Sequence, residues 1–184
     1  MASDAFGDQR QFSEYFAARR DVVRRTAYLL CGDWHWADDL TQTAFMRLAL
    51  RWRKVRDHGA LDAFVRTCLL RAYLAETRRA WRRRELSHAD VPDTRAGPDA
   101  MEQSTARTAF IAALGELAPR QRAVLVCRFY HDLDVAATAE ALGCSEGTVK
   151  THASRGLARL RTLLGDDLER LPATMTGDAR DFLA

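Results

Sequence analysis

The stretch LGCSEGTVKTHASRGLARLR, residues 142–161, carries the side chains with the clearest binding chemistry in this chain. On a helical wheel of about 100° per residue, Val149, Gly156 and Leu160 share an apolar face. Hydroxyl and cationic side chains occupy the other side and its flanks: Thr148, Lys150, Thr151, Ser154, Arg155 and Arg159. Arg and Lys donate hydrogen bonds to guanine edges or phosphates, and Thr and Ser bond to either. The pattern indicates a DNA-binding helix, with a solvated surface helix as the alternative.

Two shorter signals predict how this helix is held. Asp134 can cap a short Ala-rich helix that Gly143 ends, and Ser145 can cap the long helix that follows. A short helix, a Gly-containing turn and a second amphipathic helix form the pattern of a helix-turn-helix.

A second basic segment lies earlier in the chain, where residues 64–86 hold seven Arg against two Glu. Tyr73 and Trp81 interleave with this run as candidate stacking or wedge residues, each with packing in the core as its alternative. Proteins that hold single-stranded bases combine aromatic surfaces with cations along the phosphates. The arginines expected to follow the phosphates are Arg78, Arg79, Arg82, Arg83 and Arg84.

Composition predicts an all-α fold, because Gly and Pro number only 10 and 4 and Ala, Leu and Arg outnumber Val and Ile. Helices are expected from Gln9 to Cys31, from about residue 37 to 55, and over 61–86 with a break near its middle. Pro119 is expected to start a helix in the second half of the chain. The predicted organisation is two small helical domains, 9–86 and 104–164, with a flexible linker at 87–103 and an acidic tail at 165–184.

The motifs resemble a known family. Residues 113–161, with LAPRQRAV, AEALGCSEGTVK and RGLARLR, look like region 4 of sigma-70-type sigma factors. ADDLTQTAFMRLALRW, residues 37–52, is similar to region 2.2, and residues 63–85 are similar to regions 2.3 and 2.4. A two-domain chain of this length resembles the extracytoplasmic-function (ECF) group, closest to its actinobacterial SigE-like subset.

The resemblance implies an alternative sigma factor that binds core RNA polymerase and directs initiation at promoters with minus-10 and minus-35 elements. Its implied partners are promoter DNA, the polymerase β′ clamp helices and the β flap, with an anti-sigma factor as a further candidate.

The implied core-binding residues are Asp39, Gln42, Phe45 and Arg47; Thr43 stands where the family often has Glu. The implied minus-10 residues are Arg71, Tyr73, Arg78, Arg79, Trp81, Arg82 and Arg83. Arg71 replaces the family's Asn at the position that reads a flipped base, which predicts an altered base preference. The helix that starts at Ser145 is implied to read the minus-35 element.

Two other classes of protein share parts of this pattern. A LuxR- or TetR-type regulator of duplex DNA would share the helix-turn-helix, but the basic, aromatic first domain argues against it. An enzyme would need a catalytic constellation, and only His35, Asp38 and Asp39 have the spacing of metal ligands. We therefore expect no catalytic residues, no metal and no cofactor. With no export signal and no apolar run of about 20 residues, a cytoplasmic protein is expected.

Overall fold

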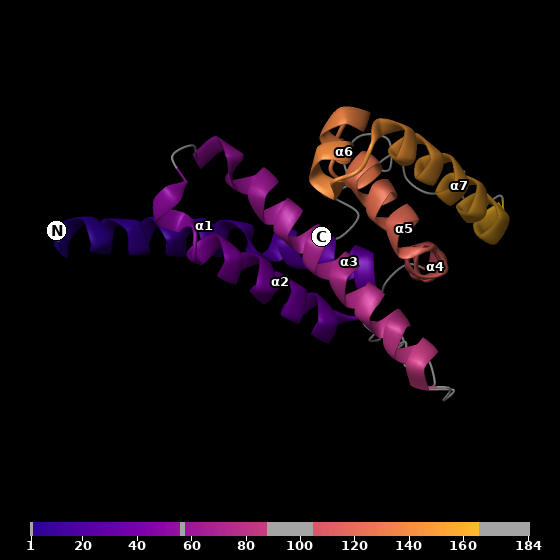
Figure 1. Cartoon of the computed structure of the whole chain (residues 1–184), viewed down its shortest axis with the longest axis horizontal. Helices are drawn as coiled ribbons and strands as arrows, with labels where there is room; N and C mark the ends of the chain where they lie inside the picture. Colours follow the sequence, from indigo (N-terminus) through magenta and orange to yellow (C-terminus); the bar gives the residue numbers. More distant parts are fainter. Residues whose placement is uncertain (1, 56–57, 88–104, 166–184) are drawn as a thin grey trace.

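The structure, a computed structural model, describes residues 2–55, 58–87 and 105–165, and these residues form helices joined by short turns (Figure 1). The predicted all-α fold is confirmed for them. Apart from Ser87 and Gly165, the predicted linker and acidic tail lie outside the described residues. In chain order the elements are α1 (Ala2–Cys31), α2 (Trp34–Ala49), the short 3-10 turns η1 (Trp52–Lys54) and η2 (His58–Ala60), α3 (Leu61–Ser87), α4 (Thr105–Gly115), α5 (Pro119–Leu125), the π-helical turn η3 (Val126–Tyr130), α6 (Val135–Leu142) and α7 (Glu146–Leu164).

The first domain is built from α1, α2 and α3, with α2 packed against both of the others. Gly32 adopts a φ of +74°, which ends α1, and the Asp33 carboxylate accepts a 2.7 Å hydrogen bond from the Trp36 amide to begin α2. The predicted break after Cys31 is confirmed, but the second helix, expected from about residue 37 to 55, runs only from Trp34 to Ala49. The first helix begins at Ala2 rather than at Gln9.

Aromatic side chains hold α1 to its neighbours. The Phe16 and Phe45 rings meet edge to face with centroids 4.8 Å apart, and Phe12 meets Trp52 in the same way at 5.2 Å. Such pairs stabilise a core beyond the area that they bury. The predicted break in the third helix is wrong: α3 runs without interruption from Leu61 to Ser87, so a single helix carries the whole basic segment.

The second domain contains α4 to α7, and its turns follow the predicted signals. Pro119 is the first residue of α5, and the Asp134 carboxylate accepts a 2.7 Å hydrogen bond from the Ala137 amide at the start of α6. Gly143 ends α6 with a φ of +63°, and Ser145 Oγ accepts from the Thr148 amide at 3.2 Å to cap α7.

The turn η3 was not predicted. The amide of His131 donates to the Val126 carbonyl at 3.1 Å, and that of Leu133 donates to the Cys127 carbonyl at 3.0 Å. These hydrogen bonds span five and six residues, whereas those of an α-helix span four, so η3 is wider than the α-helical turn that would have continued α5. They place His131 beside α1, where its Nε2 lies 3.2 Å from Thr26 Oγ1.

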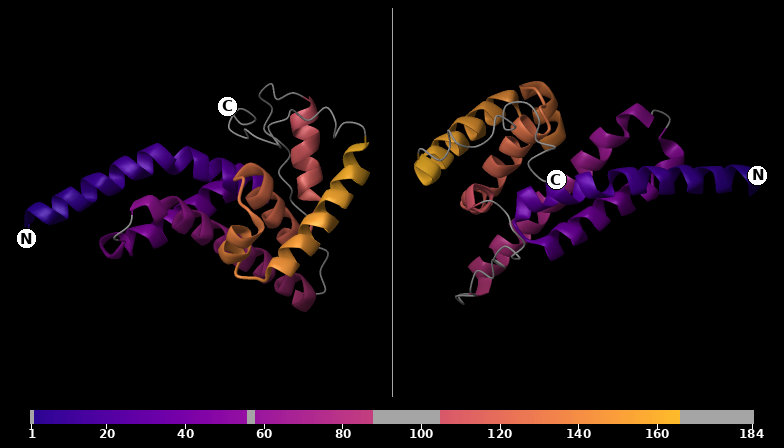
Figure 2. Two further views of the ribbon diagram at one scale, coloured as in Figure 1. Left: turned by 90° about the horizontal axis from the view of Figure 1, so that it is seen from above. Right: turned by 180° about the vertical axis from the view of Figure 1, so that it is seen from behind.

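The two domains touch along one face (Figure 2): α4, α5 and η3 contact α1, while α5 and α6 contact α3. Arg122 of α5 makes a hydrogen bond across this interface. Its Nη1 donates a 2.7 Å hydrogen bond to the carbonyl of Leu30 in the last turn of α1.

Replacing Gly156 with valine should lower the free energy of unfolding by about 1–3 kcal/mol, the usual range for overpacking. A Cβ at Gly156 would lie 3.0 Å from Leu125 Cδ1 and 3.3 Å from its Cγ, so α7 would be pushed off α5. Gly147→Ala is the control on the same helix, because a Cβ there lies 3.9 Å from its nearest neighbour, Ser145 Oγ. Equal losses for the two variants in thermal denaturation would contradict this account of Gly156.

Candidate nucleic-acid interface

Helix α7 divides into the two faces that the helical wheel predicts. Val149, Gly156 and Leu160 are buried against the rest of the second domain. On the other side, four cationic or hydroxyl side chains together with Lys150 are exposed: Thr151, Ser154, Arg155 and Arg159. This exposed surface is short, uncharged at its centre and cationic at its edges, which suits a helix lying in a major groove.

Thr148 differs from the other predicted residues of this face. It is half-buried, and its hydroxyl lies 2.9 Å from Ser145 Oγ while its amide donates to the same oxygen. Thr148 therefore belongs to the N-terminal cap of α7. Its hydroxyl sits beside the exposed surface rather than within it.

Helix α3 presents a stripe of arginines. Arg71, Arg78 and Arg82 lie seven and four residues apart, so one face of the helix carries all three, and each is exposed. Trp81 lies beside this stripe and is 60% exposed. Arg79 and Arg83 are exposed on the flank. An exposed indole among guanidinium groups is the arrangement that single-stranded nucleic acids favour.

Tyr73 does not belong to this surface. It is 1% exposed, its ring centroid lies 5.8 Å from that of Trp36, and burial raises the pKa of its hydroxyl to about 12. The interpretation of Tyr73 as a stacking residue is therefore corrected: it is a core residue between α2 and α3.

Helix α2 carries the residues predicted to bind polymerase. Asp39 and Gln42 are exposed on its outer side. Arg47 is also exposed, but its Nη1 donates a 3.3 Å hydrogen bond to the Cys68 carbonyl of α3. Arg47 therefore lies at the edge of the surface formed by Asp39 and Gln42.

Phe45 needs the same correction as Tyr73. It is 3% exposed, and Phe16 covers its ring. With its side chain turned into the core, Phe45 positions α2 and offers no surface to a partner.

Two apolar residues on the outer side of α2 were not predicted as part of a functional surface. Met46 is 59% exposed and Leu50, the residue that follows the helix, is 81% exposed. Gln42, Met46 and Leu50 are spaced four apart, and Asp39 lies three residues before Gln42, so these four side chains share one face. We call these four residues the α2 face. The i, i+4 repeat of apolar residues outside the buried set of Leu40, Ala44 and Leu48 was the signal that could have revealed it.

Comparison with known proteins identifies the family of this chain. The sequence profile of Sigma-70 region 2 matches residues 15–83, and that of Sigma-70, region 4 matches residues 107–160. The RNA polymerase sigma-E factor of Streptomyces coelicolor is 38% identical over 167 residues, which are 89% of this chain and 92% of that protein. The chain belongs to the ECF sigma factors. The ECF RNA polymerase sigma factor SigM of Mycobacterium tuberculosis is 30% identical over 167 residues, 90% of this chain and 83% of that protein.

A solved structure shares the fold of this sigma factor. The sigma factor RpoE of Bartonella quintana, solved in complex with the anti-sigma factor NepR, superposes with a TM-score of 0.71 at 24% identity. The match covers 84% of this chain and 97% of that one.

The family settles the function that the resemblance implied. ECF sigma factors are alternative sigma factors, which bind core RNA polymerase and promoter DNA to direct transcription initiation. The predicted function and these two partners are confirmed, as is the similarity to the actinobacterial sigma-E factors, and a LuxR-type regulator is not favoured. Among the described residues, no helix is both long and apolar enough to cross a membrane.

Asp38, one of the three residues with metal-ligand spacing, has a structural partner in this sigma factor. Arg24 of α1 donates to both of its carboxylate oxygens, at 2.5 and 3.1 Å, and these bonds lower the pKa of Asp38. The Arg24 guanidinium also lies 4.3 Å from the centroid of Trp34. Within the described ranges, no group of three or more His, Cys, Asp or Glu side chains could hold a metal ion.

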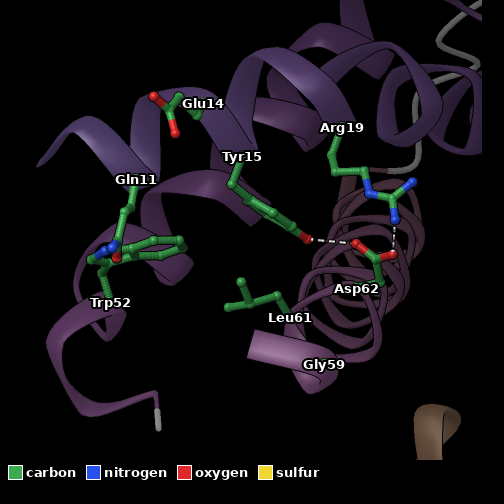
Figure 3. A pocket seen from close by; sticks show the side chains of 8 residues that line it. All are labelled: Gln11, Glu14, Tyr15, Arg19, Trp52, Gly59, Leu61 and Asp62. Atoms are coloured by element: carbon green, nitrogen blue, oxygen red, sulfur yellow. Dashed lines mark hydrogen bonds and ion pairs between the residues drawn. The ribbon is translucent and has the colours of Figure 1, made fainter. Parts of the chain in front are cut away.

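A pocket lies between α1 and the start of α3, and three of its lining side chains pair with one another (Figure 3). Tyr15 and Arg19 both donate to the Asp62 carboxylate, at 2.8 and 2.6 Å. Asp62 lies nine residues before Arg71, which puts it on the opposite side of α3 from the arginine stripe. These bonds fasten α1 to α3, and the pocket is separate from the surface that the stripe forms.

Proposed function

We propose that the first domain of this sigma factor docks on the β′ clamp helices through the α2 face and captures the melted minus-10 strand along α3. The observation that carries this proposal is the exposed stripe of Arg71, Arg78 and Arg82 with Trp81 beside it. Cations along the phosphates and an aromatic face for unstacked bases are what a melted strand requires. Arg79 and Arg83 add phosphate contacts at the flank, and Arg71 alters the base preference.

The second domain places α7 in the major groove of the minus-35 element and contacts the β flap. Thr151, Ser154 and Arg155 face the bases, while Lys150 and Arg159 hold phosphates and Thr148 supports the entry of the helix. The predicted domains 9–86 and 104–164 are the two units, and the linker 87–103 runs through the polymerase between them. An anti-sigma factor is a further proposed partner, as for the Bartonella quintana relative. The protein is cytoplasmic and acts without catalytic groups of its own.

Transcription in vitro with purified core polymerase tests the proposal. Core enzyme plus this chain should initiate on genomic fragments at discrete sites, and sequencing the transcripts should give shared minus-10 and minus-35 elements. A protein that bound duplex DNA but conferred no initiation on core enzyme would contradict it.

Arg155→Ala should reduce discrimination between the minus-35 element and a scrambled element by about 10- to 100-fold, the usual effect of losing one specific base contact. The measurement is binding of the holoenzyme to matched promoter fragments at one fixed salt concentration. Arg20→Ala, at an exposed arginine of α1, controls for the loss of one positive charge. If both variants lowered affinity equally for the two fragments, Arg155 would contact phosphates and not bases.

A further inference from the structure

Arg122 donates hydrogen bonds at the C-terminal ends of two helices from different domains, α1 and α4. Within its own domain it donates to the carbonyls of Gly115 and Leu117, at the end of α4, the latter at 3.3 Å. Across the interface it donates to Leu30 at 2.7 Å. Carbonyls in the last turn of a helix lack helical partners and carry its negative dipole end, so a buried guanidinium between them makes strong, charge-assisted bonds.

His131 makes the second contact, and both domains supply its surroundings. It approaches Thr26 of α1, which is itself buried. From α3, Arg66 and Asp62 act on the imidazole, and the Nε of Arg66 is buried without a hydrogen-bond partner among the described residues. The ring of Tyr130 covers its other side, with centroids 5.0 Å apart.

With the two domains in contact, the protein cannot bind the minus-10 and minus-35 elements at the same time. Positions minus-10 and minus-35 are about 25 base pairs apart, which is roughly 85 Å of duplex at 3.4 Å per step. In this structure α5 and α6 lie directly on α3, so α3 and α7 cannot reach both elements at once. This step rests on the proposed function, and it requires the two domains to separate on DNA.

We propose that Arg122 and His131 form a latch that holds the two domains together in the free protein, and that protonation of His131 opens it. While the domains touch, the imidazole is half-buried against α1 and close to Arg66 of α3. Opening returns it to water, where it can take up a proton, and the imidazolium cannot re-enter a site that already holds the Arg66 guanidinium.

The direction of the pH dependence follows from the two states. In the closed protein, burial first and then Arg66 lower the pKa of His131 to about 4, with Asp62 opposing. An exposed histidine has a pKa of about 6.5, so the open form binds more protons between these values. The closed form is therefore favoured above about pH 6.5, and its advantage falls roughly thirtyfold by pH 5.

Small-angle X-ray scattering of the full chain tests the latch without polymerase or DNA. From pH 7.5 to pH 5 the radius of gyration should rise, while far-UV circular dichroism shows unchanged helix content. His131→Gln, which keeps a neutral hydrogen-bonding group, should remain compact over the same range. Equal expansion of this variant, no expansion of the wild type, or separated domains already at pH 7.5 would each overturn the proposal.

A matched pair of threonine variants separates the latch from general loss of stability. Thr26 and Thr41 are both buried, and each hydroxyl donates to the carbonyl four residues earlier. Only Thr26 also faces His131. Thr26→Val should move the midpoint of the expansion to higher pH by about half to one unit, and Thr41→Val should leave it in place; equal shifts would overturn the assignment. Because scattering reports only the free chain, a failure of transcription in vitro would contradict the proposed function and leave this result standing.

Discussion

Replacing both Met46 and Leu50 with aspartate should lower the affinity of the chain for core RNA polymerase by about 100-fold or more. Docking through the α2 face would remove both apolar side chains from water, each worth about 1.5–3 kcal/mol when fully buried. The two new carboxylates would lose their hydration without a partner, which costs further free energy. The measurement is the dissociation constant of the complex with core enzyme.

The control for this double variant is Val22→Asp, because Val22 is an exposed apolar residue on α1 and is not one of the four residues of the α2 face. It should leave the affinity for core enzyme unchanged. Asp39→Ala combined with Gln42→Ala should cause a smaller loss, about tenfold, since polar groups at the rim of an interface contribute less than its apolar centre. If neither double variant changed the affinity, α2 would not be the docking helix.

Capping residues in the sequence predicted where helices begin after a turn, although the start of α1 and the end of α2 were predicted wrongly. Asp33, Asp134 and Ser145 each accept a hydrogen bond from the backbone amide three residues later. A cap depends on a few consecutive residues, so its chemistry is readable from the chain alone. The same holds for α7, whose buried face follows from the period of one helix.

The roles of Phe45 and Tyr73 could not be read in this way. Each lies on a helix that also exposes polar residues, and Phe16 and Trp36, which pack against their rings, come from other helices. The interdomain contact of Arg122 is equally invisible, because an arginine in a helix gives no sign of the carbonyl that it will meet 92 residues away. The π-helical turn η3 has no sequence signal that the periodicity of α5 would reveal.

Tyr73→Ala and Trp81→Ala should differ greatly in their effect on the free energy of unfolding, although both replace an aromatic residue of α3. Tyr73→Ala should lower the free energy of unfolding by about 3–5 kcal/mol, the cost of deleting a large buried ring. Trp81→Ala should change it by less than about 0.5 kcal/mol, as for most exposed positions. Chemical denaturation followed by circular dichroism measures both.

In promoter opening, the exposed Trp81 should matter and the buried Tyr73 should not. Trp81→Ala should weaken binding of single-stranded minus-10 DNA by holoenzyme about 10- to 100-fold, because stacking of one base on an aromatic ring is worth about 1–3 kcal/mol. Tyr73→Leu, which keeps an apolar side chain of useful volume, should remain folded and bind that strand like the wild type. If Tyr73→Leu lost as much affinity as Trp81→Ala, the Tyr73 ring would have to leave the core during melting. The cost of emptying that site would then be part of the barrier to opening the promoter.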